Sequence, residues 1–192
     1  MASRLEEIGV NAVELNLSCP HAERLGLEVS KDRRLALSIV KSVRDSIKIP
    51  LFVKLGLQDD IIDLAKALED LGIDAVVAIN TIRAIAIDIY VRKPVLSNIY
   101  GGLSGIAIHP IAVRVVYDLY KNIELPIIGV GGVEDWMDAI EFILAGASAV
   151  EIGTAIYYKD LNVFKEIIEG IKNYMINEGF TNISELIGLA HK

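Results

Sequence analysis

The sequence predicts an α/β protein whose strands form a parallel sheet. Five short apolar runs alternate with segments of helical periodicity, which is typical of repeated βα units. A glycine, two further residues and then Ala-Val open three of these runs, beginning at Gly9, Gly72 and Gly146. Hydrophobic residues make up 53% of the 192 residues. The mean hydropathy is +0.44, as expected when parallel strands are buried on both faces.

The predicted strands all begin at a recognisable boundary. Glycine-ended helices precede three of them, and Pro50 and Pro126 stand directly before the other two. Proline lacks an N–H group and is tolerated at the first residue of a strand. The expected strands cover residues 12–17, 51–55, 75–80, 127–130 and 149–152.

The predicted helices occupy the segments between these strands. Asp32 can cap a helix in which Leu35, Ile39 and Val43 share one face. Asp59 or Asp60 starts the next helix, and a glycine at the C′ position ends several of them. The expected helices cover residues 2–8, 32–46, 60–71, 109–120, 135–145 and 162–177, with a short one after 181.

One long segment, residues 81–104, interrupts this alternation. It contains Pro94 and the pair Gly101-Gly102, which are typical of turns. Loops of this length inside a compact domain are usually functional. We therefore expect a functional loop with a hairpin of its own.

Composition and charge exclude several classes of function. The net charge is −7, so a surface for the phosphate backbone of nucleic acids is not expected. A single cysteine excludes an internal disulfide and a multi-cysteine metal site, and we predict no metal. There is neither an apolar run of ~18 residues nor a signal peptide, which predicts a cytoplasmic protein without a membrane partner. Residues 1–192 contain no linker and are expected to form one domain.

Polar and glycine residues gather where the predicted strands end. Barrel enzymes build their sites at that face, and phosphate often binds after the last two strands. An open doubly wound sheet is the alternative, but no G-x-G-x-x-G follows the first strand. The pattern therefore favours part of a (β/α)8 TIM barrel, to which this chain supplies about five βα units. The strand-end residues are Asn16, Ser18, Cys19, Lys54, Asn80, Thr81, Gly131, Gly132, Gly153 and Thr154.

Cys19 is the most reactive candidate among them. It is the only cysteine and lies in the run Asn16-Leu17-Ser18-Cys19-Pro20-His21. A thiol at a strand end is placed to meet a ligand and to gain or lose a proton. An inert buried thiol is the alternative, because cysteine is among the most buried residue types. For Lys54 the alternative is a lysine that reaches solvent, and for Asn80 it is a turn residue.

The chain resembles the class 1 dihydroorotate dehydrogenases, which use a cysteine base. Order and spacing of the matching motifs agree along essentially the whole chain. The motifs are Asn16-Leu17-Ser18-Cys19-Pro20, Val53-Lys54-Leu55, Ile79-Asn80-Thr81, Arg92-Lys93-Pro94, Gly101-Gly102-Leu103-Ser104-Gly105, the run from Pro126 to Gly132, and Gly153-Thr154.

This resemblance implies an FMN enzyme that oxidises dihydroorotate to orotate in pyrimidine biosynthesis. Cys19 would take a proton as general base, and Lys54 would lie at the pyrimidine edge of the flavin. Asn16 would bind both substrate and flavin. Asn80 and Thr81 would bind the substrate. The flavin and its phosphate would contact Ile79, Gly105, Gly131, Gly132, Gly153 and Thr154. His21, His109 and Trp136 are assigned no chemistry.

The resemblance also implies partner proteins, and the chain differs from the family pattern in two respects. Some class 1 enzymes pair with an iron–sulfur flavoprotein and others use fumarate, and these barrels are commonly homo-oligomers. The family barrel has eight units, so the three N-terminal units are missing here and the chain resembles the C-terminal two-thirds. His21 stands where the family often has asparagine. The alternatives are a dihydropyrimidine dehydrogenase-like enzyme, a tRNA-dihydrouridine synthase, which the acidic charge disfavours, and an inactive truncated fragment.

Overall fold

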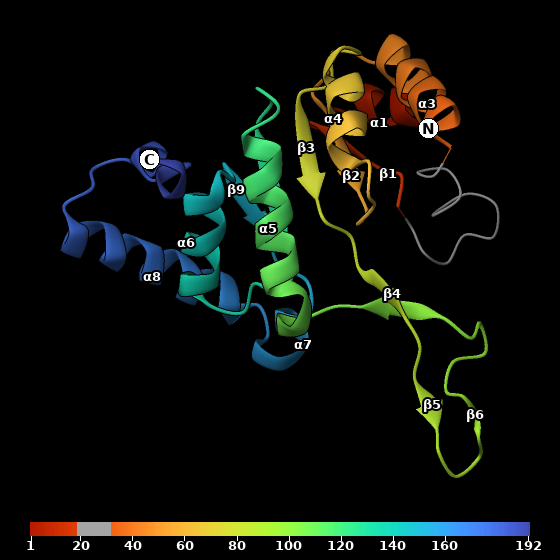
Figure 1. Ribbon diagram of the computed structural model, residues 1–192. Coiled ribbons are helices and arrows are strands. Elements are labelled where there is room, and N and C mark those ends of the chain that lie inside the picture. Colours follow the sequence, from red (N-terminus) through yellow and green to blue (C-terminus); the bar gives the residue numbers. More distant parts are fainter. Residues whose placement is uncertain (19–31) are drawn as a thin grey trace.

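The computed structural model describes residues 1–18 and 32–192, and its centre is a parallel sheet (Figure 1). All five predicted strands are confirmed, with ends shorter by one or two residues in three of them. In spatial order the strands are β1 (Val13–Asn16), β2 (Leu51–Leu55), β3 (Ala75–Ala78), β8 (Ile127–Val130) and β9 (Ala149–Glu151).

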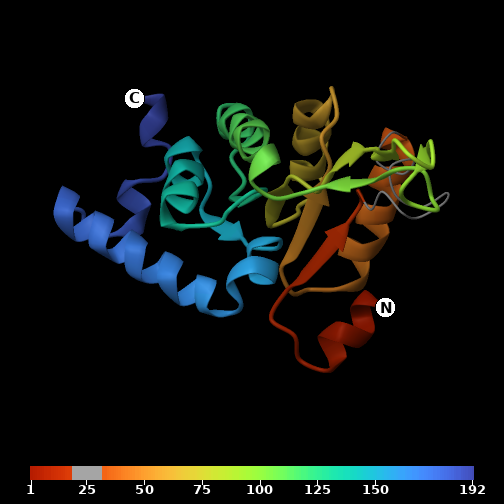
Figure 2. The ribbon, with the colours of Figure 1, turned by 90° about the horizontal axis from the view of Figure 1, so that it is seen from below.

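The order of the strands distinguishes a barrel from a doubly wound sheet. Each strand pairs with the next strand of the same sheet along the chain, and the order never reverses. A doubly wound sheet reverses its order at a switch point. When the strand order runs in one direction, right-handed crossovers place every connecting helix on the same face of the sheet. Figure 2 shows these helices in an arc around the strands, so the barrel-type α/β prediction is confirmed.

The main predicted helices are confirmed as well. They are α1 (Ala2–Glu7), α3 (Arg33–Ser46), α4 (Ile61–Glu69), α5 (His109–Tyr120), α6 (Trp136–Ala145) and α8 (Asn162–Glu178). The short helix α7 (Ala155–Lys159) was not predicted, because five residues give no readable periodicity. The predicted C-terminal helix is two 3₁₀ turns, Ile183–Glu185 and Leu189–His191. A third 3₁₀ turn, Ile106–Ile108, leads into α5.

Caps at the helix starts explain several boundaries. The Asp32 carboxylate accepts a hydrogen bond from the Leu35 N–H at 3.1 Å, as predicted. Asp135 accepts from Met137 and Asp138, and the Asp138 side chain accepts in return from the Asp135 N–H, which makes a capping box. Asp60, rather than Asp59, precedes α4 and makes no such bond to the helix backbone.

The two faces of the sheet differ in chemistry. Leu51, Val53 and Leu55 of β2 are fully buried and pack in the core beneath the helices. Residues paired across parallel strands share a face, and Asn16 pairs with Lys54 while Val130 pairs with Glu151. Since side chains alternate along a strand, the inner face presents polar groups. They are Glu14, Asn16, Lys54 and Glu151.

The long segment after β3 forms two antiparallel strand pairs, where a single hairpin was predicted. β4 (Ile82–Ala84) pairs with β7 (Gly101–Leu103), and β5 (Ile87–Asp88) pairs with β6 (Lys93–Pro94). Together they make an arm that projects from the sheet (Figure 1). Within the described residues, no helix is both long enough and apolar enough to cross a bilayer.

Replacing Asp135 with alanine should lower the free energy of unfolding by about 1–2 kcal/mol, because α6 loses the cap that binds its first N–H groups. Urea denaturation measures the loss. Asp60→Ala is the matched control, since Asp60 occupies the same position of α4 without a cap bond, and should cost under about 0.5 kcal/mol. Equal losses in the two variants would contradict this account of the caps.

Candidate functional site

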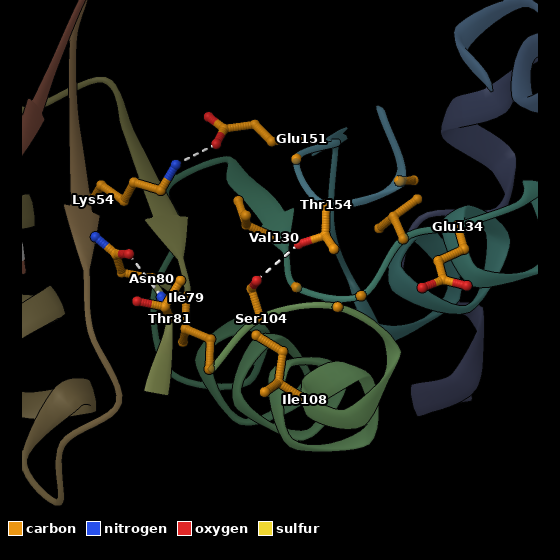
Figure 3. Close-up of a pocket in the computed structure, with 16 residues that line it drawn as sticks. Lys54, Ile79, Asn80, Thr81, Ser104, Ile108, Val130, Glu134, Glu151 and Thr154 are labelled. Carbon is orange, nitrogen blue, oxygen red and sulfur yellow. Dashed lines mark hydrogen bonds and ion pairs between the residues drawn. The ribbon is translucent and has the colours of Figure 1, made fainter. Parts of the chain in front are cut away.

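A cavity of about 250 Å³ opens at the carboxyl ends of the strands (Figure 3). It lies among β2, β3, β8, β9 and the segments that follow them. Every predicted cofactor residue except Asn16 lines it. The lining residues are Lys54, Ile79, Asn80, Thr81, Ser104, Gly105, Ile108, Val130, Gly131, Gly132, Val133, Glu134, Glu151, Gly153, Thr154 and Ala155.

One side of the cavity is built from glycines, and at Gly132 there is no room for a larger residue. Gly132 has a φ of +70°, and a Cβ atom there would lie 2.8 Å from the carbonyl oxygen of Gly105. Thr154 closes the neighbouring wall, where its Oγ1 donates a hydrogen bond to the Ser104 Oγ at 2.8 Å. Backbone without Cβ atoms beside hydroxyl groups is a suitable surface for phosphate.

Side-chain amides make the opposite wall. The Asn16 Oδ1 accepts hydrogen bonds from the Ser18 N–H at 3.1 Å and from the Asn80 Nδ2 at 3.1 Å. The Asn80 Oδ1 in turn accepts from the Thr81 N–H at 2.7 Å. Asn16 therefore contacts the cavity through Asn80, and the chain of bonds fixes the orientation of both amides. Such amides can bind the alternating donors and acceptors of a planar heterocycle.

Ile79 and Cys19 are two further residues that the sequence predicts for the site. Ile79 is 1% exposed and donates its N–H to the Val130 carbonyl at 3.0 Å, so it forms part of the wall between β3 and β8. Its peptide bond with Ala78 is cis. Cys19, like His21, lies outside the described residues.

Among the described residues that line the cavity, Lys54 is the basic one, and it lies between two carboxylates. Its Nζ is 3.5 Å from the Glu14 Oε1 and hydrogen-bonds to the Glu151 Oε2. The Lys54 side chain is only 16% exposed. Figure 3 shows Lys54 and Glu151 reaching toward each other across the cavity from different strands. Lys54 therefore faces the cavity, and its role toward a flavin stays a prediction.

The carboxylate of Glu14 lies near that of Glu151, and this environment affects the ionisation of Glu14. Burial raises the pKa of Glu14 to about 7, and its hydrogen bond to Glu151 and the charge of that residue act in the same direction. Lys54 opposes the rise without cancelling it. Near neutral pH, Glu14 thus takes up or releases a proton beside the cavity.

Sequence reasoning missed the acidic residues and several wall residues. Glu14 lies two residues before Asn16, and Glu151 two residues before Gly153, so the alternation of a strand could have placed both on the inner face. Ser104 and Val130 belonged to recognised motifs but were given no role. Nothing in the sequence marks Ile108 or Glu134 as cavity residues.

Comparison with known proteins gives a consistent result. The family model described as dihydroorotate dehydrogenase matches residues 1–175. The catalytic subunit of dihydroorotate dehydrogenase B (NAD(+)) from Pyrococcus furiosus is 52% identical, over 100% of this chain and 64% of the relative. The subunit of the same name from Methanocaldococcus jannaschii is 45% identical, over 100% of this chain and 62% of the relative.

Solved structures agree with these sequence matches. A crystal structure of DHODH from Eimeria tenella in complex with ferulenol superposes with a TM-score of 0.82 at 26% identity. The superposition covers 100% of this chain and 57% of the Eimeria tenella chain. The chain thus spans somewhat less than two thirds of the length of the relatives it matches.

Replacing Glu151 with glutamine should lower the pKa of Glu14 from about 7 toward 4.5, because the neighbouring negative charge is removed. Burial persists, so the pKa should remain above 4.5. Carboxyl ¹³C NMR titration measures the change. Glu178→Gln, a change on the exposed end of α8, is the control and should leave the Glu14 titration unaltered.

The same shift makes stability depend on pH. The folded state binds the Glu14 proton more tightly than the unfolded chain, so the stabilisation is complete below pH 4.5 and is lost as pH rises through about 7. Glu14→Gln should remove this loss from the pH profile of the unfolding free energy. An unchanged profile in that variant would contradict the raised pKa.

Proposed function

Because the chain belongs to the dihydroorotate dehydrogenase family, we propose that its cavity binds FMN and serves the oxidation of dihydroorotate to orotate in pyrimidine biosynthesis. The observation that supports this most is the joining of three kinds of group in one cavity. The Gly131-Gly132 turn, which is suited to phosphate, the largely buried Lys54 and the Asn80 amide, which is hydrogen-bonded to Asn16, line a common space. This is the set that a phosphorylated flavin and a pyrimidine together require.

The residues present fit the phosphate end of FMN. Gly105, Gly132 and Thr154 form a wall in which an added Cβ at Gly132 would collide with backbone. Close approach of backbone N–H groups to an anion needs such a surface. Gly131 and Gly153 border the same space, and Ile79 would contact the flavin through its backbone.

The polar wall fits the reacting ends of flavin and substrate. Lys54 would place its charge where electron density increases on reduction, and Glu14 and Glu151 would hold its ammonium group in place. Asn80 and Thr81 would hydrogen-bond the substrate ring, while Asn16 fixes the Asn80 amide and contacts substrate and flavin. When bound, the flavin supplies the hydride acceptor.

Cys19 is proposed as the general base. Oxidation of dihydroorotate removes a hydride from one ring carbon and a proton from its neighbour, so a group near the ring must accept that proton. Cys19 follows the Asn16 to Ser18 segment, which borders the cavity through Asn80. A thiol with an ordinary pKa near 8.5 can be adjusted for this task by its surroundings.

Further strands and partners are also part of the proposal. A barrel of this class has eight strands, and the described residues form five, with β1 and β9 at the edges. We propose that the cavity reaches full flavin affinity in a closed barrel, in a cytoplasmic homo-oligomer. Since close relatives are named catalytic subunits of an NAD(+) enzyme, an iron–sulfur flavoprotein subunit is the proposed electron acceptor.

The purified protein should show the visible absorbance of bound flavin, and dihydroorotate added without oxygen should bleach it. Anaerobic spectrophotometry makes the measurement, with dihydrouracil as the matched comparison. A flavin that responds to dihydrouracil but not to dihydroorotate would instead indicate the dihydropyrimidine-reducing relatives. A protein that binds no flavin would contradict the proposed cofactor site.

Cys19→Ser should slow anaerobic bleaching by about 100-fold or more, because a hydroxyl is a much weaker base than a thiolate at neutral pH. Stopped-flow absorbance measures the rate. The flavin content of the variant should equal that of the parent, since the proposed role of Cys19 is proton transfer. Bleaching at the parental rate would exclude Cys19 as the base.

A further inference from the structure

His109 is a buried titratable residue that the proposed function does not use. It begins α5 and is only 5% exposed. Its Nδ1 lies 3.1 Å from the Gly131 carbonyl oxygen, and its Nε2 lies 3.1 Å from the Glu141 Oε2. The edge of the Phe142 ring packs against it, with ring centroids 5.1 Å apart at 89°. These contacts fix the orientation of the imidazole ring.

The partners of the ring also define its hydrogen bonds. A carbonyl oxygen only accepts, so Nδ1 must donate to Gly131. Nε2 faces the Glu141 carboxylate at 3.1 Å and the Asp138 Oδ1 at 3.7 Å, which are acceptors too. The two acidic side chains thus lie on the Nε2 side of the ring, while its Nδ1–H is directed at the Gly131-Gly132 turn.

That hydrogen bond determines where the next N–H group points. In a planar trans peptide the carbonyl of Gly131 and the N–H of Gly132 point in opposite directions. Holding the carbonyl against buried His109 turns the Gly132 N–H away from His109. Within residues 1–18 and 32–192, this N–H has no hydrogen-bond partner, and Gly132 lines the cavity. It is thus a donor available to an anion there.

We propose that His109 is a positioning residue for the phosphate-binding turn. Its Nδ1–H holds the Gly131 carbonyl so that the Gly132 N–H faces the bound anion, and Glu141 and Asp138 hold the ring in the required orientation. His109 itself does not touch the ligand. The identity of the anion as the flavin phosphate rests on the proposed function. The hydrogen bond by which His109 fixes the Gly131 carbonyl does not rest on the proposed function.

Two substitutions separate the hydrogen bond from the packing. The asparagine amide nitrogen can occupy the position of Nδ1, so His109→Asn keeps a donor for Gly131. The glutamine amide reaches the position of Nε2, so His109→Gln keeps contact with Glu141 and loses Gly131. Both remove the ring from the Phe142 contact. A difference between the variants therefore reports the bond to Gly131.

The ligand test compares FMN with riboflavin, which has the same ring system and no phosphate. His109→Gln should weaken FMN binding by roughly five- to tenfold, as expected for one lost hydrogen bond. Riboflavin binding should change by less than about twofold in both variants, and His109→Asn should retain FMN affinity within about twofold. Fluorescence titration of the protein measures all six values.

A second measurement needs no flavin. Hydrogen exchange of the Gly132 amide, followed by ¹H–¹⁵N NMR, should accelerate in His109→Gln but not in His109→Asn. Equal behaviour of the two variants, in this measurement or in FMN affinity, would overturn the positioning role. If the parent protein did not distinguish FMN from riboflavin, the proposed phosphate site would be wrong. The measurement at the Gly132 amide would then test the positioning role of His109 without reference to the phosphate.

Discussion

The register between neighbouring parallel strands is the constraint on which the site depends. Leu51, Val53 and Leu55 must all face the helices, because each is fully buried in the core. The alternation of β2 then places Lys54 on the opposite face, level with Asn16. A slip of one residue would bury the ammonium group among apolar side chains and expose leucine or valine in the cavity. Burial on the helix side thus determines the chemistry of the inner side.

The sequence was most informative where an apolar run marks a strand, because the geometry of a parallel sheet then places the end of that strand. The runs before Asn16, Asn80 and Gly131 are apolar and bounded by glycine or proline, and parallel strands bring their carboxyl ends to one edge. The positions of the strands and of most cavity residues therefore follow from pattern alone. The strand order was then needed to decide between a barrel and a doubly wound sheet.

Contacts between distant residues could not be predicted in this way. Lys54 and Glu151 are 97 positions apart, and no local pattern indicates that they meet. The same holds for His109, whose partners Gly131 and Glu141 belong to the next βα unit. Sequence patterns describe one element at a time, whereas a hydrogen bond between elements depends on how both are packed. Helix α7 was missed for a simpler reason, because it has barely more than one turn.

Two nitrogen donors of the described site, Lys54 and the His109 ring, are accompanied by acidic side chains. Lys54 lies between Glu14 and Glu151, and the His109 ring faces Glu141 and Asp138. A pairing of this kind reduces the net charge of the site and fixes the direction of each donor. Preorganised donors contribute to binding and catalysis because they need no rearrangement when the ligand arrives. The site therefore holds its donors in a fixed geometry.

The unreversed strand order has a consequence for how the chain matures during synthesis. Each strand of the sheet pairs with the one made before it, so every βα unit that leaves the ribosome finds its neighbour already present. Pairing between consecutive units keeps the separation of contacting residues shorter than it would be in a sheet whose strand order reverses. The cavity, however, includes Glu151 and Thr154 from the last unit of the sheet. The cavity is therefore complete only after the last βα unit of this sheet has been made.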